Sequence, residues 1–276
     1  MKAKLIIRSN HIYRCSGGMS DQIIDGYVAL ADDCIQTVTA GEIPNDLCAP
    51  DTKIIDARGQ TVVPGLIDPH THLVHGGSRE RELALKLRGA SYLDILKAGG
   101  GILSTVNATR QASSAELKQK AWRSLDQMLL HGTTTVEAKS GYGLDFDHEM
   151  KCLQVARELN LEHPVDIVGT YMGAHAIPPE YKNNPQGYID VMLREVIPYV
   201  ADTRLAEFMD VFCEEGVFSP EQAKLLLEAG QKMGLKAKIH ADEIIPLQGA
   251  ELAAELGAVS ADHLLAASDE GLMAML

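Results

Sequence analysis

The pattern of apolar and polar positions changes near residue 60. Before it, short apolar or alternating runs at residues 5–8, 27–30 and 35–38 are separated by Gly, Asp, Asn and Pro, which is typical of a small β-rich module. After Gly59, short apolar runs alternate with amphipathic stretches, which indicates repeated β-α units around a parallel sheet. We therefore expect an incomplete N-terminal β-sandwich module at residues 1–60 and a β-α domain at residues 61–276.

Six strands are expected in the second domain, each a short apolar run followed by polar residues. They span residues 61–67, 133–138, 165–172, 206–213, 236–240 and 259–262. Capping boxes at Ser113/Glu116 and Ser219/Gln222 predict the starts of two intervening helices, and Gly132 and Gly234 stand where those helices should end.

Six β-α units in one direction predict an α/β fold, a (β/α)8 TIM barrel of which about six units are present. A doubly wound open sheet is the alternative. The chain stops at Leu276, inside the helix that Ser268 is expected to cap. Six strands without the last two would leave two sheet edges unpaired, so we expect a C-terminally truncated barrel.

Composition narrows the class of protein. The chain has 276 residues, 46% of them hydrophobic, and a formal net charge of −13, which fits a globular enzyme and disfavours a nucleic-acid partner. Its five cysteines are widely spread and never form a C-x-x-C pair, so a reducing cytoplasm is expected. No signal peptide or membrane-spanning apolar stretch is recognisable, and no membrane partner is expected.

Histidines gather where the predicted strands end. His70 and His72 follow the first strand at i, i+2 spacing, so both imidazoles project from one face of an extended chain and can reach one metal ion. His240 ends the fifth strand at the same predicted rim. Three neutral imidazoles suit one Zn or Fe ion and leave a position for water. The alternative for the His70/His72 pair is two exposed loop histidines.

Three further strand-end residues are candidates for acid–base chemistry or substrate contact. Glu243, just after the fifth strand, is placed to move protons between a bound water and a leaving nitrogen, and a solvated loop carboxylate is its alternative. His263 could orient the water or stabilise an oxyanion, and could equally be a core histidine. His175 ends the third strand in the same way.

Two loop residues could hold a substrate. Arg79 offers a planar fork suited to a carboxylate, and Tyr142 lies between glycines that allow close backbone approach. A surface ion pair and a packing residue are their respective alternatives. The glycine-rich run at residues 97–102 lacks the Gly-Lys-Ser/Thr ending of a phosphate loop and is interpreted as a flexible active-site loop.

Together these stretches resemble the amidohydrolase superfamily and, within it, the imidazolonepropionase family. The resemblance runs from about residue 60 to the end of the chain and is carried by residues 68–74, 76–80, 98–105, 137–143, 173–176, 210–214, 238–243 and 260–263. At Gln248 the family more often has glycine, and His75 stands where an aromatic residue is expected. The family's Asp ligand on the eighth strand has no counterpart in this chain.

The resemblance implies a reaction and a set of roles. The family adds water to 4-imidazolone-5-propanoate, giving N-formimidoyl-L-glutamate in histidine degradation, with one Zn or Fe ion per subunit. By this resemblance the metal ligands are His70, His72 and His240, the substrate-binding residues are Arg79, Tyr142, His175 and Glu243, and the catalytic pair is Glu243 and His263. It also implies an anionic small-molecule substrate and a homodimer, as is common in the superfamily.

Two other functions stay open at this point. A sister amidohydrolase or aminohydrolase would act on another ring substrate and would not need Arg79. An inactive fragment that binds a metal or a partner without turnover would follow from the missing strands.

Overall fold

The structure is a computed structural model that describes residues 2–15, 23–89 and 100–276. The chain forms two compact units, residues 1–66 and 67–276. No helix in the described part of the chain is long and apolar enough to cross a membrane.

The first unit is a mixed β-sheet. Its strands are β1 (Ala3–Tyr13), β2 (Ile23–Ala31), β3 (Cys34–Ala40), β4 (Cys48–Asp56) and β5 (Thr61–Val62), with a 3-10 turn η2 (Asn45–Leu47) before β4. The sheet order is β3-β2-β1-β4, and β5 also pairs with β1. The hairpin strands β1, β2 and β3 are antiparallel, whereas β4 and β5 run parallel to β1. Ile6, Tyr27 and Ala29 form its buried core.

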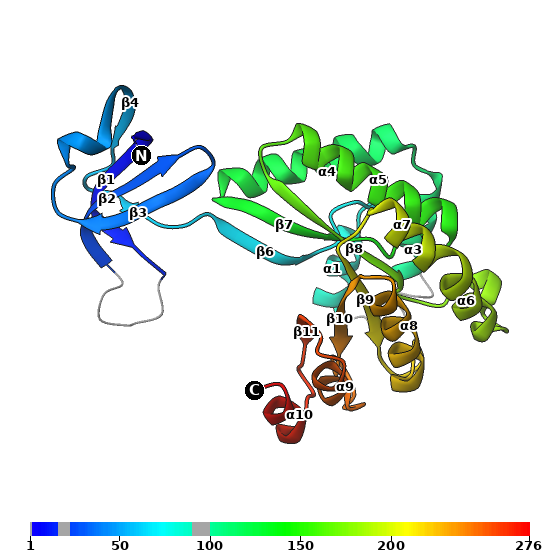
Figure 1. The fold of residues 1–276 in the computed structure, drawn as a ribbon. Helices are drawn as coiled ribbons and strands as arrows, with labels where there is room; N and C mark the ends of the chain where they lie inside the picture. Colours follow the sequence, from blue (N-terminus) through cyan, green and yellow to red (C-terminus); the bar gives the residue numbers. More distant parts are fainter. Residues whose placement is uncertain (1, 16–22, 90–99) are drawn as a thin grey trace. The chain divides into compact units, whose positions relative to one another are not determined.

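The second unit is built on a six-stranded sheet in sequential order, as a TIM barrel requires (Figure 1). Its strands are β6 (Leu66–Thr71), β7 (Thr133–Lys139), β8 (Asp166–Ala174), β9 (Phe208–Cys213), β10 (Lys236–Ala241) and β11 (Ser260–His263). The pairs from β7 to β11 are parallel. Parallel strands bring their carboxyl ends to one rim, which is where the predicted site residues lie.

The first predicted barrel strand, residues 61–67, is wrong in its bounds. Thr61 and Val62 instead pair with His11 and Ile12 of β1. Pro64, which has no N–H to donate, and Gly65 then interrupt the strand pattern, and the barrel strand begins at Leu66. The remaining five strands lie within a few residues of their predicted positions, so the chain passes from one unit to the other slightly later than residue 60.

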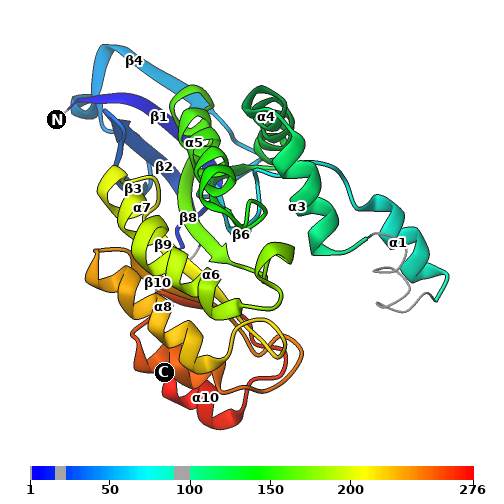
Figure 2. The same cartoon turned by 90° about the vertical axis from the view of Figure 1, so that its right-hand side faces the viewer.

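Helices cover the outer side of this sheet, as Figure 2 shows for α4, α5 and α8. In chain order the helical elements are α1 (Glu80–Leu87), α3 (Ile102–Gln111), α4 (Ser114–Leu130), α5 (Phe146–Glu162), η3 (Pro179–Tyr181), α6 (Pro185–Val191), the π-helical η4 (Met192–Val196), α7 (Ile197–Thr203), α8 (Pro220–Lys232), α9 (Gly249–Glu255) and α10 (Asp269–Ala274). Helix α4 packs on β7, α5 on β8, and α8 on β9 and β10. This alternation confirms the predicted β-α architecture.

The predicted helix starts are confirmed. Ser113 with Glu116 and Ser219 with Gln222 both form complete capping boxes. Ser268 accepts from the Gly271 N–H at the start of α10. Gly132 and Gly234 adopt φ of +90° and +91°, the left-handed conformation that ends a helix at little cost for glycine.

Helix α5 offers a matched test of the packing. Leu159 is fully buried in the core that α4, α5 and β7 share, whereas Leu161, two residues later, is 80% exposed. Leu159→Ala is expected to lower the free energy of unfolding by about 2–5 kcal/mol because it removes buried methyl groups and leaves a cavity. Leu161→Ala should change it by about 0.5 kcal/mol or less. Urea denaturation of both variants measures the difference, and equal losses would contradict this packing.

Candidate metal centre

Three imidazoles from two strands converge at the carboxyl-end rim. Ligand atoms of His70, His72 and His240 lie within 4.8 Å of one another. The ring centroids of His70 and His240 are 4.6 Å apart, and those of His72 and His240 are 6.0 Å apart. Strand β6 and the residue after it supply the first two side chains, and β10 supplies the third. The i, i+2 spacing therefore does place His70 and His72 on the same side of the strand end.

Each of these imidazoles is anchored through the same ring atom. Nδ1 of His70 lies 3.0 Å from Asp262 Oδ2, and Nδ1 of His240 lies 2.9 Å from Asp210 Oδ2. Nδ1 of His72 lies 2.9 Å from the carbonyl oxygen of Ser140. An imidazole that donates from Nδ1 has its lone pair on Nε2, which is the usual arrangement of metal-binding histidines. The donor set thus fits a Zn- or Fe-type ion.

Burial keeps part of this cluster uncharged. It lowers the pKa of His72 well below the ordinary value, and the neighbouring His175 and His240 lower it further. Burial also lowers the pKa of His175 to about 4. A neutral imidazole is the form that binds a metal ion or accepts a hydrogen bond at neutral pH.

A buried ion cluster lies directly behind the imidazoles. Lys139 Nζ is 2.7 Å from Asp210 Oδ2, 3.0 Å from Asp262 Oδ2 and 3.0 Å from Glu137 Oε1. Burial alone would lower the pKa of Lys139, but the three carboxylates outweigh it and hold the pKa above its usual range. Lys139 is therefore a permanent cation that holds the two anchoring aspartates.

Three of the predicted substrate-contacting residues, His175, Tyr142 and Arg79, lie next to His72 or to one another. His175 stacks on His72 with ring centroids 4.6 Å apart and planes 13° apart, and Tyr142 lies 5.1 Å from His72 and 5.2 Å from His175. Burial raises the pKa of Tyr142, and the charge of the adjacent Arg79 opposes that effect. Arg79 is in turn held by Glu82, through Nε at 3.0 Å and NH2 at 2.7 Å.

Glu243 and His263 lie next to each other, beside His240 and His70. His263 Nε2 lies 3.6 Å from Glu243 Oε2, and the His263 ring is 4.9 Å from His240 and 5.2 Å from His70. His263 adopts φ of +76° and Asp242, beside Glu243, adopts φ of +48°. Left-handed conformations are costly for residues with a side chain and are often retained at functional positions.

Sequence comparison finds similar proteins of one kind. A sequence model described as amidohydrolase family matches residues 53–139. The chain is 57% identical to the imidazolonepropionase of Treponema denticola and 58% identical to that of Alkaliphilus oremlandii, each over 92% of this chain. It is 61% identical to the Geobacillus sp. imidazolonepropionase over 82% of this chain. The chain is therefore similar to imidazolonepropionases over most of its own length. It spans 62%, 60% and 53% of the length of these three relatives.

Solved structures that are similar to this chain support the fold. A 5-methylcytosine deaminase from Klebsiella pneumoniae matches with a TM-score of 0.61 at 17% identity, over 91% of this chain and 56% of that one. Escherichia coli guanine deaminase matches with a TM-score of 0.54 at 12% identity, over 91% of this chain and 55% of that one. Both likenesses concern the fold alone.

Two departures from the imidazolonepropionase family pattern have structural consequences. Gln248 precedes α9 with φ of +63°, a conformation that glycine adopts without strain, so glycine would fit this position. The His75 ring lies 5.9 Å from Tyr142, so it takes the place of an aromatic neighbour of the site. Residues 97–99 of the predicted glycine-rich loop lie outside the described residues, and the N–H of Gly101 donates to Glu82 Oε1 at 2.8 Å.

Several supporting residues were not singled out from the sequence. Asp242 accepts from the N–H groups of Leu247, Gly249 and Ala250 and so orders the loop that carries Glu243. Glu214 Oε2 accepts from Ile244 N at 2.9 Å in the same loop. The buried ion cluster could have been recognised from the sequence, because most of its residues are charged residues inside otherwise apolar strands. Examples are Glu137, Lys139, Asp210 and Lys238.

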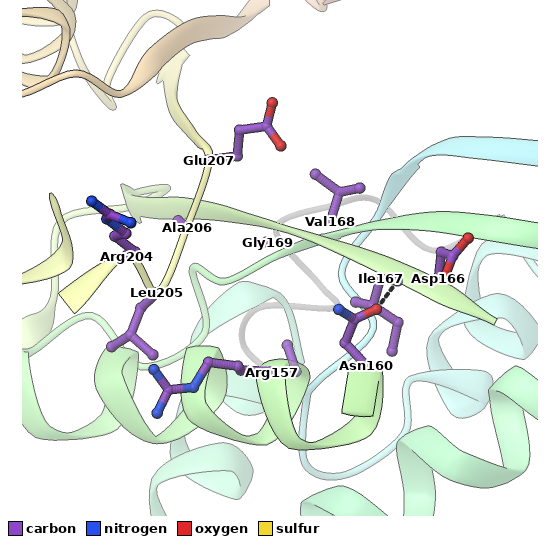
Figure 3. A pocket seen from close by; sticks show the side chains of 11 residues that line it. Arg157, Asn160, Asp166, Ile167, Val168, Gly169, Arg204, Leu205, Ala206 and Glu207 are labelled. Carbon is purple, nitrogen blue, oxygen red and sulfur yellow. Dashed lines mark hydrogen bonds between the residues drawn. The ribbon is translucent and has the colours of Figure 1, made fainter. Parts of the chain in front are cut away.

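A hollow lies at the amino-terminal end of the strands, away from the rim that carries the three histidines. It has a volume of about 370 Å³ and is lined by the start of β8, the residues before β9 and the end of α5 (Figure 3). Arg157 and Arg204 line it, and Asn160 binds the Ile167 N–H at its floor. It contains no imidazole, so it does not belong to the metal centre.

Glu149 controls the loop that carries Tyr142. Its buried carboxylate accepts from the N–H groups of Gly141, Gly143 and Leu144 at 2.7–3.1 Å. Glu149→Ala would leave these donors without an acceptor, and we expect the free energy of unfolding to fall by about 3 kcal/mol or more. Glu158→Ala, which removes a 52% exposed partner of Lys118 from the same helix, should cost about 1 kcal/mol or less. Urea denaturation compares the two, and a Glu149→Ala loss no larger than the control would refute this role.

Removal of one imidazole tests the metal centre. His240→Ala is expected to weaken zinc binding by more than about 100-fold, because loss of a ligand should exceed the 10–100-fold effect of losing a supporting residue. The exposed His131, at the end of α4, supplies the control variant His131→Ala, which should leave the affinity unchanged. Competition with a chromogenic chelator measures both. Equal zinc affinity in the wild type and His240→Ala would exclude this centre.

Proposed function

We propose that this chain carries the metal centre and substrate site of an enzyme that hydrolyses 4-imidazolone-5-propanoate to N-formimidoyl-L-glutamate. The observation that carries the proposal is the three-imidazole cluster anchored through Nδ1, in a chain 57–61% identical to curated imidazolonepropionases. Arg79 lies beside Tyr142, where its guanidinium group would bind the carboxylate of the substrate.

The metal-binding residues are His70, His72 and His240, and one Zn or Fe ion fits their donor atoms. When bound, such an ion lowers the pKa of a water molecule and polarises the ring carbonyl. Burial favours the neutral form of His72, which needs to release no proton to accept such an ion.

The chain's own residues orient the substrate. Arg79 binds the propanoate carboxylate through its guanidinium group, with Glu82 fixing the direction of that group. Tyr142 and His175 contact the imidazolone ring, and their packing against His72 sets the distance between ring and metal centre. Binding is thereby restricted to ring substrates with a short carboxylate arm.

Proton transfer is assigned to Glu243 and His263. Glu243 also contacts the substrate, takes a proton from the attacking water and returns it to the ring nitrogen as the C–N bond breaks. His263 lies within 3.6 Å of Glu243 and orients the water and the developing oxyanion. The burial that lowers the pKa of His263 keeps it neutral while it does so.

The test is an assay of the 276-residue chain with imidazolone propanoate, with Zn or Fe supplied and with guanine and cytosine as comparison substrates. The proposal predicts loss of the imidazolone absorbance and no change with the two nucleobases. Turnover of a nucleobase would indicate a sister aminohydrolase. Zinc binding without turnover of any substrate would indicate a binding-only chain.

Arg79→Ala separates substrate binding from chemistry. Loss of a charge-assisted pair worth about 1.5–3 kcal/mol should raise KM for imidazolone propanoate by about 10–100-fold, with a smaller effect on kcat. Arg123→Ala, on the exposed side of α4, is the control and should change neither constant. Steady-state kinetics with both variants measure this. A kcat loss without a KM change would contradict the assignment.

Further expectations belong to the same proposal. All five cysteines are free thiols, which supports a cytoplasmic location. The net charge of −13 supports a small-molecule substrate rather than nucleic acid. A homodimer and the choice between Zn and Fe stay predictions.

A further inference from the structure

A second group of potential metal ligands lies next to the three histidines. One ligand atom each from Asp210, His240 and Asp262 lies within 4.8 Å of the others. Asp210 and His240 are buried and Asp262 is nearly so. Two carboxylates and an imidazole at such separations are a donor set that divalent cations accept.

The ammonium group of Lys139 stands between the two carboxylates of that group. Its Nζ is 2.7 Å from Asp210 Oδ2 and 3.0 Å from Asp262 Oδ2, and its side chain is fully buried. These are the same two oxygen atoms that contact Nδ1 of His240 and His70. The Lys139 ammonium group therefore pairs with both carboxylates that contact the imidazoles.

We propose that Lys139 fills, with its ammonium group, the position of a second cation beside the three-histidine centre and so limits the centre to one metal ion. The inference rests on the metal centre of the proposed function. It makes Lys139 a positioning residue, because it acts on the ligands through Asp210 and Asp262 and contacts neither substrate nor ion.

The buried charges are consistent with this role. Three carboxylates, Glu137, Asp210 and Asp262, share two lysines, Lys139 and Lys238. Without Lys139, the Asp210 and Asp262 carboxylates would face each other with no cation between them. An uncompensated buried charge pair is strongly unfavourable, and a metal ion would relieve it.

Lys238 provides a matched control. It is also a buried lysine on a barrel strand, and its Nζ is 2.7 Å from Glu137 Oε2. Its Nζ also lies 3.3 Å from the carbonyl oxygen of Pro69 and 5.5 Å from the centre of the Phe208 ring, and among the described residues its one ion pair is with Glu137. Removing it takes one positive charge from the same cluster without opening a position between the two aspartates.

The experiment counts zinc ions per folded chain. Wild type, Lys139→Met and Lys238→Met are dialysed to equilibrium at a fixed free zinc concentration, and zinc and protein are quantified by elemental analysis. We expect Lys139→Met to bind one ion more than the wild type, and Lys238→Met to bind the same number as the wild type. An unchanged count in folded Lys139→Met overturns the proposal, and so does an equal gain in Lys238→Met.

Two further variants keep the test decisive if Lys139→Met folds poorly without metal. Lys139→Gln removes the charge but keeps a hydrogen-bonding group between the carboxylates, and it should also gain one ion when refolded with zinc. The double variant Lys139→Met/Asp262→Asn removes one carboxylate of the pair and should return to the wild-type count. A gain in the double variant, or none in Lys139→Gln, overturns the proposal. Because no substrate is used, these counts are independent of whether the chain hydrolyses imidazolone propanoate.

Discussion

The ion cluster of Glu137, Asp210, Asp262, Lys139 and Lys238 is the constraint on which the rest of the site depends. These side chains come from β7, β9, β10 and β11, so the cluster ties together strands that are far apart in the sheet. Buried charges are tolerated only when each one is paired and hydrogen-bonded. The ion pairs fix the positions of the Asp210 and Asp262 carboxylates, which accept hydrogen bonds from Nδ1 of His240 and His70. Nε2 of each imidazole is therefore the nitrogen left for a metal ion.

Strands and loops position different residues of the site. The three imidazoles of the candidate metal centre lie on strands or directly at their ends, where the sheet determines their positions. Tyr142 and Glu243 lie on loops, and both loops are held by buried carboxylates. Glu149 holds the loop with Tyr142, and Asp242 and Glu214 hold the loop with Glu243. Acceptors of this kind satisfy backbone N–H groups that would otherwise be buried without a partner. Loop conformation is thus coupled to the packing of the helices that carry or follow those carboxylates.

The sequence predicted the strand order, the capped helices and the gathering of five histidines at one rim, because hydrophobic periodicity and capping residues are local signals. It misplaced the first barrel strand, since the pairing of Thr61 and Val62 with β1 depends on a partner some fifty residues earlier in the chain. It also gave no role to Lys139 or Glu149. Both act through partners that become neighbours only in the folded chain, such as Asp262 for Lys139. A charged residue in an apolar strand can be recognised from the sequence, but the sequence does not show which residue it pairs with in the folded chain.

The central claim is that His70, His72 and His240 together hold one ion through Nε2. X-ray absorption spectroscopy at the zinc edge of the chain loaded with one equivalent of zinc tests it most directly. The account predicts three imidazole nitrogens at about 2.0–2.1 Å, with the outer-ring scattering that only histidine gives. A spectrum with fewer than three imidazoles, or with carboxylate oxygens as the main ligands, would contradict it.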